Sequence, residues 1–107
     1  MKETLLIDVG KSRNRVTEIS NGYLTQDALS PHEFTENAQN DVLKYDYVSL
    51  IHERVTDIDK DGEDFIVSTP TDKSTSRQVL LATGLKEETP DIPNFDEFYG
   101  TSAFYCP

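Results

Sequence analysis

The chain has 107 residues, with 20 Asp and Glu against 10 Lys and Arg, which gives a formal net charge of −10. A chain of this length forms one domain, and Leu, Ile, Val and Phe supply about a quarter of it, which argues against a wholly disordered protein. The negative charge argues against binding to nucleic acid or to an anionic membrane, because both depend on Lys and Arg. With one cysteine and no long apolar run, the sequence predicts a cytoplasmic protein without internal disulfides or membrane spans.

The first apolar run predicts a strand that is buried on both faces. Leu5, Leu6, Ile7 and Val9 place apolar side chains on both sides, as is typical of a parallel sheet. The run ends at Asp8-Val9-Gly10. The following residues, 11–29, are polar and have no regular period, which is typical of a functional loop or of disorder.

A helix is predicted over about residues 31–45. Ser30 can cap it, Pro31 suits its first position, and Glu33 completes a capping box three residues after the cap. One apolar stripe then follows the helical period, at Phe34, Ala38, Val42 and Tyr45.

Beyond the helix the apolar period changes to two, which predicts strands. We expect them at Val48–Ile51, Val55–Ile58, Phe65–Val67 and, after a polar turn at Pro70–Thr75, as a buried strand at Val79–Ala82. Asp61-Gly62 is a turn dipeptide that joins two strands of a three-stranded meander. The tail has prolines at Pro90, Pro93 and Pro107, so irregular structure with packed aromatic residues is expected there. This order of elements predicts an α/β layout with a parallel component.

Asp8 is the first candidate for a ligand contact. An acidic residue at the carboxyl end of a buried parallel strand is where dinucleotide-binding folds bind the two ribose hydroxyls. The alternative is an aspartate that begins a loop and accepts hydrogen bonds from nearby amides.

Two further positions have weaker local signals. Thr83-Gly84 ends the apolar run at Val79–Ala82, where small residues allow a ligand close to the backbone, although a plain strand exit has the same pattern. Cys106 stands in Phe-Tyr-Cys-Pro, one residue before the end of the sequence, without the second thiol of a Cys-x-x-Cys pair, so an incidental thiol is the simpler interpretation.

No metal site is predicted. His32 and His52 lack a second His or Cys at ligand spacing. The carboxylates from Asp57 to Asp64 resemble a calcium loop only loosely, because Gly62 falls at the sixth position but Ser68 stands where the twelfth requires Glu. A solvated hairpin is the better interpretation.

Several segments together resemble the FAD-binding domain of thioredoxin-reductase-like flavoproteins, in the pyridine-nucleotide disulfide oxidoreductase group, over about residues 4–107. LLIDVGKSRN is similar to the second strand of that domain with its terminal acid and turn. NGYLTQD is similar to a loop near the flavin. VLLATGLKEETPDIPNFDEFYG is similar to the strand and exit towards a nicotinamide-binding domain, and SAFYCP to the lead-in to Cys-Pro-x-Cys.

The resemblance implies a role for six residues. Asp8 matches the acid on the adenosine ribose, Arg13 lies in the turn near the cofactor phosphates or flavin, and the Val55 backbone would meet the adenine. Thr83 and Gly84 match the segment behind the cofactor, and Cys106 matches the thiol that exchanges with a substrate disulfide. In this family electrons pass from NAD(P)H through FAD to a cysteine pair and on to a thioredoxin-like or small disulfide substrate. A homodimer is compatible with the resemblance.

The chain also departs from the family pattern. It contains neither the first strand with its G-x-G-x-x-G turn nor the second cysteine. We therefore expect an incomplete Rossmann-like FAD-binding domain, with parallel strands, one main helix and a meander over about residues 4–89. An exit segment is expected over about 90–107. The first strand is normally central, so its neighbours are expected to have unpaired edges and exposed apolar faces.

The residues and the resemblance leave three functional interpretations open. In the first, the chain is part of a flavin-dependent disulfide oxidoreductase and is inactive and colourless by itself. In the second, it is a non-enzymatic module that a separate chain completes by adding a strand. In the third, it is a small acidic interaction domain, for which no parallel pairing among the strands at residues 4–9, 48–51 and 79–83 would be expected.

Overall fold

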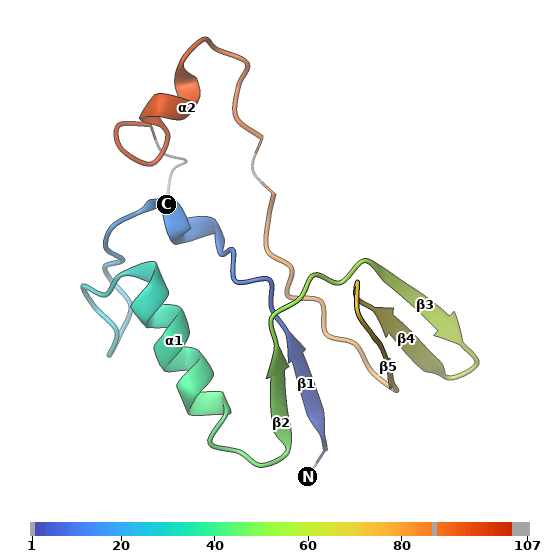
Figure 1. The fold of residues 1–107 in the computed structure, drawn as a ribbon. Helices are drawn as coiled ribbons and strands as arrows, with labels where there is room; N and C mark the ends of the chain where they lie inside the picture. Colours follow the sequence, from blue (N-terminus) through green and yellow to red (C-terminus); the bar gives the residue numbers. More distant parts are fainter. Residues whose placement is uncertain (1, 87, 104–107) are drawn as a thin grey trace. The chain divides into compact units, whose positions relative to one another are not determined.

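The computed structural model describes residues 2–86 and 88–103 of the chain, shown as a ribbon in Figure 1. The residues divide into two compact units. The first unit comprises Met1–Lys11 and Val42–Thr83, and the second comprises Ser12–Asp41 and Gly84–Pro107.

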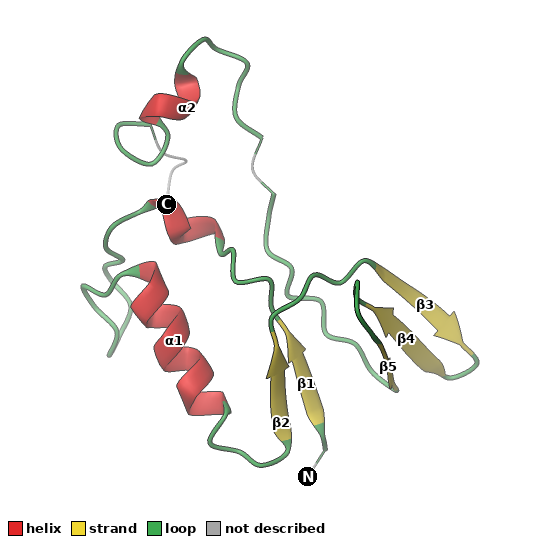
Figure 2. Cartoon of the chain, in the orientation of Figure 1, coloured by secondary structure: helices red, strands yellow, loops and turns green. Residues whose placement is uncertain are grey.

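The first unit contains a parallel pair of strands. β1 (Thr4–Ile7) pairs with β2 (Val48–Ile51), with Thr4 opposite Val48 and Ile7 opposite Ile51 (Figure 2). The predicted parallel component is therefore confirmed. The expectation that the first strand is buried on both faces is wrong, because Leu5 is 37% exposed and Val9 43% exposed. In the described part of the chain β2 is the sole strand that pairs with β1, so the other side of β1 has no covering strand.

The same unit contains a three-stranded meander as predicted, but not of the three predicted strands, because Val48–Ile51 belongs to the parallel pair. β3 (Asp57–Asp61), β4 (Asp64–Ser68) and β5 (Lys73–Ser76) form an antiparallel sheet in that order. The turn between β3 and β4 contains Gly62 with a φ of 62°, a conformation that glycine adopts without steric penalty. Val67 on β4 is the buried apolar residue of this sheet, with 8% of its surface exposed.

Three assignments in this region differ from the prediction. The strand expected at Val55–Ile58 is shifted along the chain to β3, Asp57–Asp61. The third strand of the meander lies partly in Pro70–Thr75, where the sequence predicts a polar turn, because Lys73–Ser76 finds a partner in β4. Val79–Ala82 is not a strand, and Leu80 and Leu81 are 92% and 68% exposed. An extended segment becomes a strand only when a neighbour accepts its backbone hydrogen bonds, and no described strand lies beside this one.

The second unit contains the main helix. α1 (Pro31–Val42) ends three residues before the predicted boundary. Its last turn contains Asp41 and no basic residue, so this turn itself supplies no side-chain cation to offset the negative end of the helix dipole. Tyr23 packs edge-on against Phe34 of the predicted apolar stripe, with ring centroids 5.0 Å apart.

The unit also contains two short elements that the sequence does not indicate. A 3-10 turn, η1 (Arg13–Val16), lies in the polar segment after β1, and a one-turn helix, α2 (Phe95–Phe98), lies in the proline-containing tail. The sequence predicts irregular structure at both places. Asn94 precedes α2 in a left-handed conformation, which lets the chain turn sharply into the helix after Pro93.

The predicted capping box at the start of α1 is confirmed. The Glu33 N–H donates to Ser30 Oγ over 3.2 Å, and Glu33 Oε2 accepts from the Ser30 N–H over 3.0 Å and from the Ser30 hydroxyl over 2.7 Å. The Ser30 hydroxyl and the Ser30 N–H hold the pKa of the Glu33 carboxyl below its ordinary value of 4.5. The ionised carboxylate is therefore the form that completes the box.

Removal of this cap is the first test of the fold. Ser30→Ala is expected to destabilise α1 by about 1 kcal/mol, because a first-turn N–H loses its acceptor. Because the pKa of Glu33 is lowered by folding, the unfolded state binds more protons at acid pH. The stabilisation is thus complete above pH 4.5 and is lost as the pH falls through the lower folded pKa.

Circular dichroism of the helix as a function of denaturant and pH measures both effects. Glu36→Gln is the matched control, since Glu36 lies on the same helix with 62% of its side chain exposed, and its carboxylate is 3.9 Å from His32 Nδ1. Equal losses in Ser30→Ala and Glu36→Gln would contradict the capping assignment.

Candidate functional site

The carboxyl ends of β1 and β2 lie at the same edge of the parallel pair, because parallel strands point the same way. The Asp8 N–H donates to the Ile51 carbonyl over 3.1 Å, so Asp8 lies beside the point where β2 ends. The residues after Ile51 run from His52 to Thr56. Two of the six predicted site residues, Asp8 and Val55, therefore belong to segments that leave this one edge of the sheet.

The half-buried Asp8 already has a local structural role. Its Oδ1 accepts a hydrogen bond from the Gly10 N–H over 2.9 Å, and Gly10 has a φ of 69°. This arrangement is the loop-starting aspartate that the sequence leaves open as an alternative.

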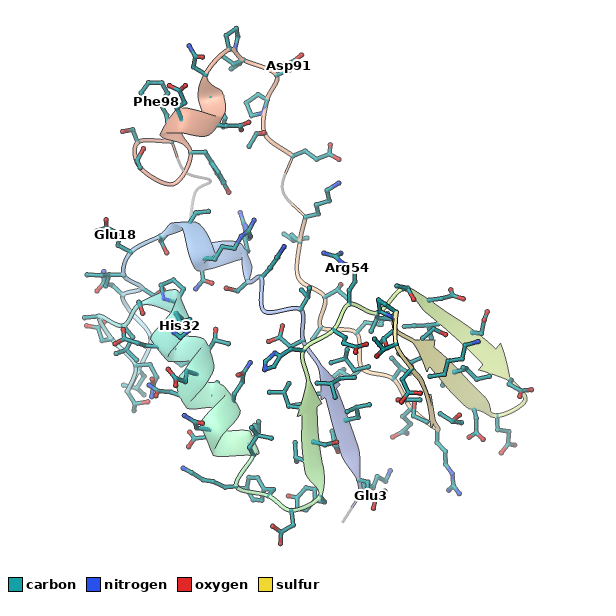
Figure 3. The ribbon with its side chains drawn as sticks, viewed as in Figure 1. Glu3, Glu18, His32, Arg54, Asp91 and Phe98 are labelled. Carbon is teal, nitrogen blue, oxygen red and sulfur yellow. The ribbon has the colours of Figure 1, made fainter. Side chains whose placement is uncertain are left out.

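Val55 lies outside any strand. It follows β2 by four residues and is 37% exposed, and the next residue, Thr56, donates its N–H to the Ser68 carbonyl over 2.8 Å. The segment therefore passes from the parallel pair to the meander with its backbone at Val55 near the start of β3. Arg54, in the same connection, is labelled in Figure 3.

Glu53 is a polar residue of this connection that sequence reasoning missed. Its Oε1 accepts a hydrogen bond from the Thr71 hydroxyl over 2.5 Å, while Oε2 is buried without a hydrogen-bond partner among the described residues. The hydroxyls of Thr69 and Thr71 hold the pKa of the Glu53 carboxyl below its ordinary value. Glu53 thus ties the connection after β2 to the turn before β5.

Arg13 belongs to the second unit, whereas Asp8 and Val55 belong to the first. It begins the η1 turn and is exposed, and Arg15 in the same turn donates from Nη1 to the Ser12 carbonyl over 3.0 Å. The turn therefore carries two arginines in a chain of strong negative charge.

Thr83 and Gly84 lie where the first unit ends and the second begins. Both are exposed, and Gly84 has a φ of 66°. Among the described residues other than its two chain neighbours, none has an atom within 4 Å of the place a β-carbon would occupy. The left-handed backbone explains the glycine, but no described atom approaches it. Cys106, the sixth predicted residue, lies outside the described residues.

The described residues contain no group of three or more His, Cys, Asp or Glu side chains that could hold a metal ion. The carboxylates that resemble a calcium loop lie on the β3–β4 hairpin, with Asp61 opposite Asp64 in the ladder, as the hairpin interpretation predicts. His32 stands on the first turn of α1 and is exposed (Figure 3). In the part of the chain that the structure describes, no helix is both long and apolar enough to span a membrane.

Comparison with solved structures shows close agreement over almost the whole chain. A crystal structure from Bacillus anthracis, assigned as the thioredoxin reductase TrxB, superimposes with a TM-score of 0.93 at 42% sequence identity, over 99% of this chain and 36% of that one. The oxidoreductase from Agrobacterium tumefaciens gives a TM-score of 0.91 at 34% identity, again over 99% of this chain and 36% of that one. The chain belongs to the thioredoxin-reductase-like family.

Curated relatives agree with this family assignment. A probable thioredoxin reductase from Arthroderma benhamiae is 30% identical over 99% of this chain and 28% of its own length. A thioredoxin reductase from Claviceps purpurea is 26% identical over 98% of this chain and 34% of its own length. The chain thus spans about a third of the curated relatives it matches, and no protein-family model matches it.

Proposed function

We propose that residues 1–107 form the sugar-side part of an FAD-binding domain in a thioredoxin-reductase-like flavoprotein. The observation that carries this proposal is the edge shared by β1 and β2, where Asp8 and the connection through Val55 leave the sheet. In open α/β sheets, ligands bind outside the carboxyl ends of parallel strands. The likeness to solved oxidoreductases supports the same interpretation.

The residues present fit one part of FAD. Asp8 is a carboxylate, the group type that accepts hydrogen bonds from ribose hydroxyls, and Val55 is partly exposed, as a residue beside an adenine ring would need to be. Arg13 is a cation suited to phosphate, and Thr83 with Gly84 would lie behind the cofactor. No G-x-G-x-x-G turn occurs in residues 1–107, so these residues do not supply the amide cradle for the diphosphate.

In the whole protein, the proposed reaction oxidises NAD(P)H and reduces a disulfide substrate. Bound FAD would carry the two electrons. The substrate disulfide gains two electrons and two protons and becomes a dithiol. Cys106 is proposed as the thiol that exchanges with the substrate, and a thioredoxin-like protein or a small disulfide is the proposed partner. The single cysteine of this stretch suits a reducing compartment such as the cytoplasm, and a homodimer is the proposed assembly.

The test compares two polypeptides. The 107-residue chain is expected to be colourless and unable to reduce a model disulfide with NADPH. A longer product of the same locus that adds a glycine-rich turn before residue 1 and a second cysteine after Cys106 is expected to show a flavin spectrum and to catalyse the reaction. A longer product that binds no flavin would contradict the proposal, as would a yellow 107-residue chain.

One observation favours a second candidate, a module completed by another chain. The N–H groups of Thr4 and Asp8 point towards β2, since they donate to the carbonyls of Tyr47 and Ile51. Backbone groups alternate along a strand, so Leu5 and Ile7 direct theirs to the opposite edge, where no described strand pairs. A separate strand could pair there. The small acidic interaction domain is less favoured, because β1 and β2 pair in parallel, although residues 79–83 do not join them as a strand.

A further inference from the structure

Gly100 and Val16, which belong to the two chain segments of the second unit, approach each other closely. A β-carbon placed on Gly100 would lie 3.0 Å from the Val16 β-carbon and 3.0 Å from the Val16 carbonyl oxygen. Gly100 also has a φ of 87°, which side-chain-bearing residues rarely adopt. Only glycine therefore fits at this contact, for reasons of both backbone conformation and space.

The segment around Gly100 is tightly hydrogen-bonded within itself. The N–H groups of Thr101, Ser102 and Ala103 all donate to the Phe98 carbonyl over 2.9 to 3.1 Å, and the Gly100 N–H donates to the Ala103 carbonyl over 3.0 Å. The rings of Phe95 and Tyr99 stack with their centroids 6.3 Å apart. The residues Phe95–Ala103, which we call the Phe95–Ala103 turn, are therefore held in shape by their own hydrogen bonds and ring stacking (Phe98 is labelled in Figure 3).

The η1 turn lies on the other side of the contact. It contains no buried residue. The backbone hydrogen bonds around it are local, from the Arg15 N–H to the Ser12 carbonyl over 3.3 Å and from the Thr17 N–H to the Asn14 carbonyl over 3.0 Å. Local bonds of this kind open readily, so the approach of Gly100 is a long-range restraint on this turn.

We propose that Gly100 is a positioning residue, whose contact with Val16 holds the η1 turn, and with it Arg13, against the Phe95–Ala103 turn. The role of Arg13 in cofactor binding rests on the proposed function, but the contact and its effect on η1 do not. A β-carbon at position 100 requires Val16, including its backbone, to shift by a few tenths of an ångström, which is expected to loosen the turn.

The experiment measures amide hydrogen exchange in the 107-residue chain and in Gly100→Ala. Exchange at residues 13–17 and 98–103 is expected to become faster, whereas exchange in the β3–β4 hairpin of the first unit stays unchanged. Gly22→Ala is the matched control: Gly22 lies in the same unit with a φ of 82°, but no protein atom lies within 4 Å of the place its β-carbon would occupy. The control measures the effect of left-handed strain alone. The increase in exchange rate is expected to be about tenfold larger in Gly100→Ala than in Gly22→Ala.

Two further readouts separate positioning from general damage to the fold. Val16→Gly combined with Gly100→Ala removes one of the two closest atoms and is expected to restore part of the protection. Modification of Arg13 by phenylglyoxal, measured against Arg54 in the first unit, is expected to be faster in Gly100→Ala and unchanged in Gly22→Ala.

The proposal is overturned if Gly100→Ala and Gly22→Ala have the same effect, if the double variant recovers nothing, or if η1 is unprotected in the parent chain. A longer product that binds no FAD while these exchange results hold would refute the role of Arg13 in the proposed function, and would leave the Gly100 contact established.

Discussion

Thermal unfolding of the isolated 107-residue chain is expected to be broad and weakly cooperative. Among the described residues only Pro31 and Val67 are buried, while Leu80 and Leu81 are largely exposed. A neighbouring strand with about four buried aliphatic side chains would contribute on the order of 6–12 kcal/mol. The free energy of unfolding of a domain is only about 5–15 kcal/mol, so a chain without such a strand lacks most of that free energy.

Calorimetry on a sample shown to be monomeric by sedimentation measures this directly. Addition of a polypeptide that supplies an apolar strand parallel to β1 is expected to sharpen the transition and raise its midpoint, because the added strand pairs with Leu5 and Ile7 and covers apolar surface. A peptide of the same composition in scrambled order is the control. A sharp transition in the monomer without any partner would show that the exposed apolar residues do not lower the stability of the chain.

The second large effect is expected at Asp8 in a flavin-binding form of the protein. Asp8→Asn is expected to weaken FAD binding by about tenfold to a hundredfold, because a carboxylate that accepts from two ribose hydroxyls is replaced by a neutral amide. The amide oxygen can still accept from the Gly10 N–H, so the turn after β1 is preserved. Fluorescence titration with FAD measures the change.

Asp61→Asn is the matched control for this substitution. Asp61 is an exposed aspartate beside the turn between β3 and β4, so its replacement removes the same charge at a distant place in the same unit. Equal affinities in Asp8→Asn and the parent protein would identify Asp8 as a loop-starting residue only. Equal losses in both variants would indicate a general effect of net charge.

The elements with strong local signals were predictable from the sequence. Ser30, Pro31 and Glu33 act within one helical turn, so the capping box and the start of α1 could be derived without knowledge of the rest of the chain. Asp61-Gly62 likewise indicated the β3–β4 hairpin. The resemblance of the chain as a whole to thioredoxin-reductase-like proteins agrees with the structural comparison.

The errors occur where a segment's state depends on a neighbour. Val79–Ala82 has the composition of a buried strand, but strand formation needs a partner, and the described residues do not provide one. Lys73–Ser76 is polar and its sequence predicts a turn, but it pairs with β4 and forms β5. The link from Glu53 to Thr71 has no sequence signal, because the two residues are 18 positions apart.

By itself, the sequence determined the family, the main helix with its cap, the parallel and antiparallel strand types, and Asp8 as the acid at the end of the first strand. The tertiary structure alone decided that Asp8 lies next to the end of β2, that the third meander strand is Lys73–Ser76, and that Gly100 touches Val16. The physical reason is the separation along the sequence of the residues that interact. Caps and turns act over three or four residues, whereas strand partners and close backbone approaches join residues that only the folded chain brings together.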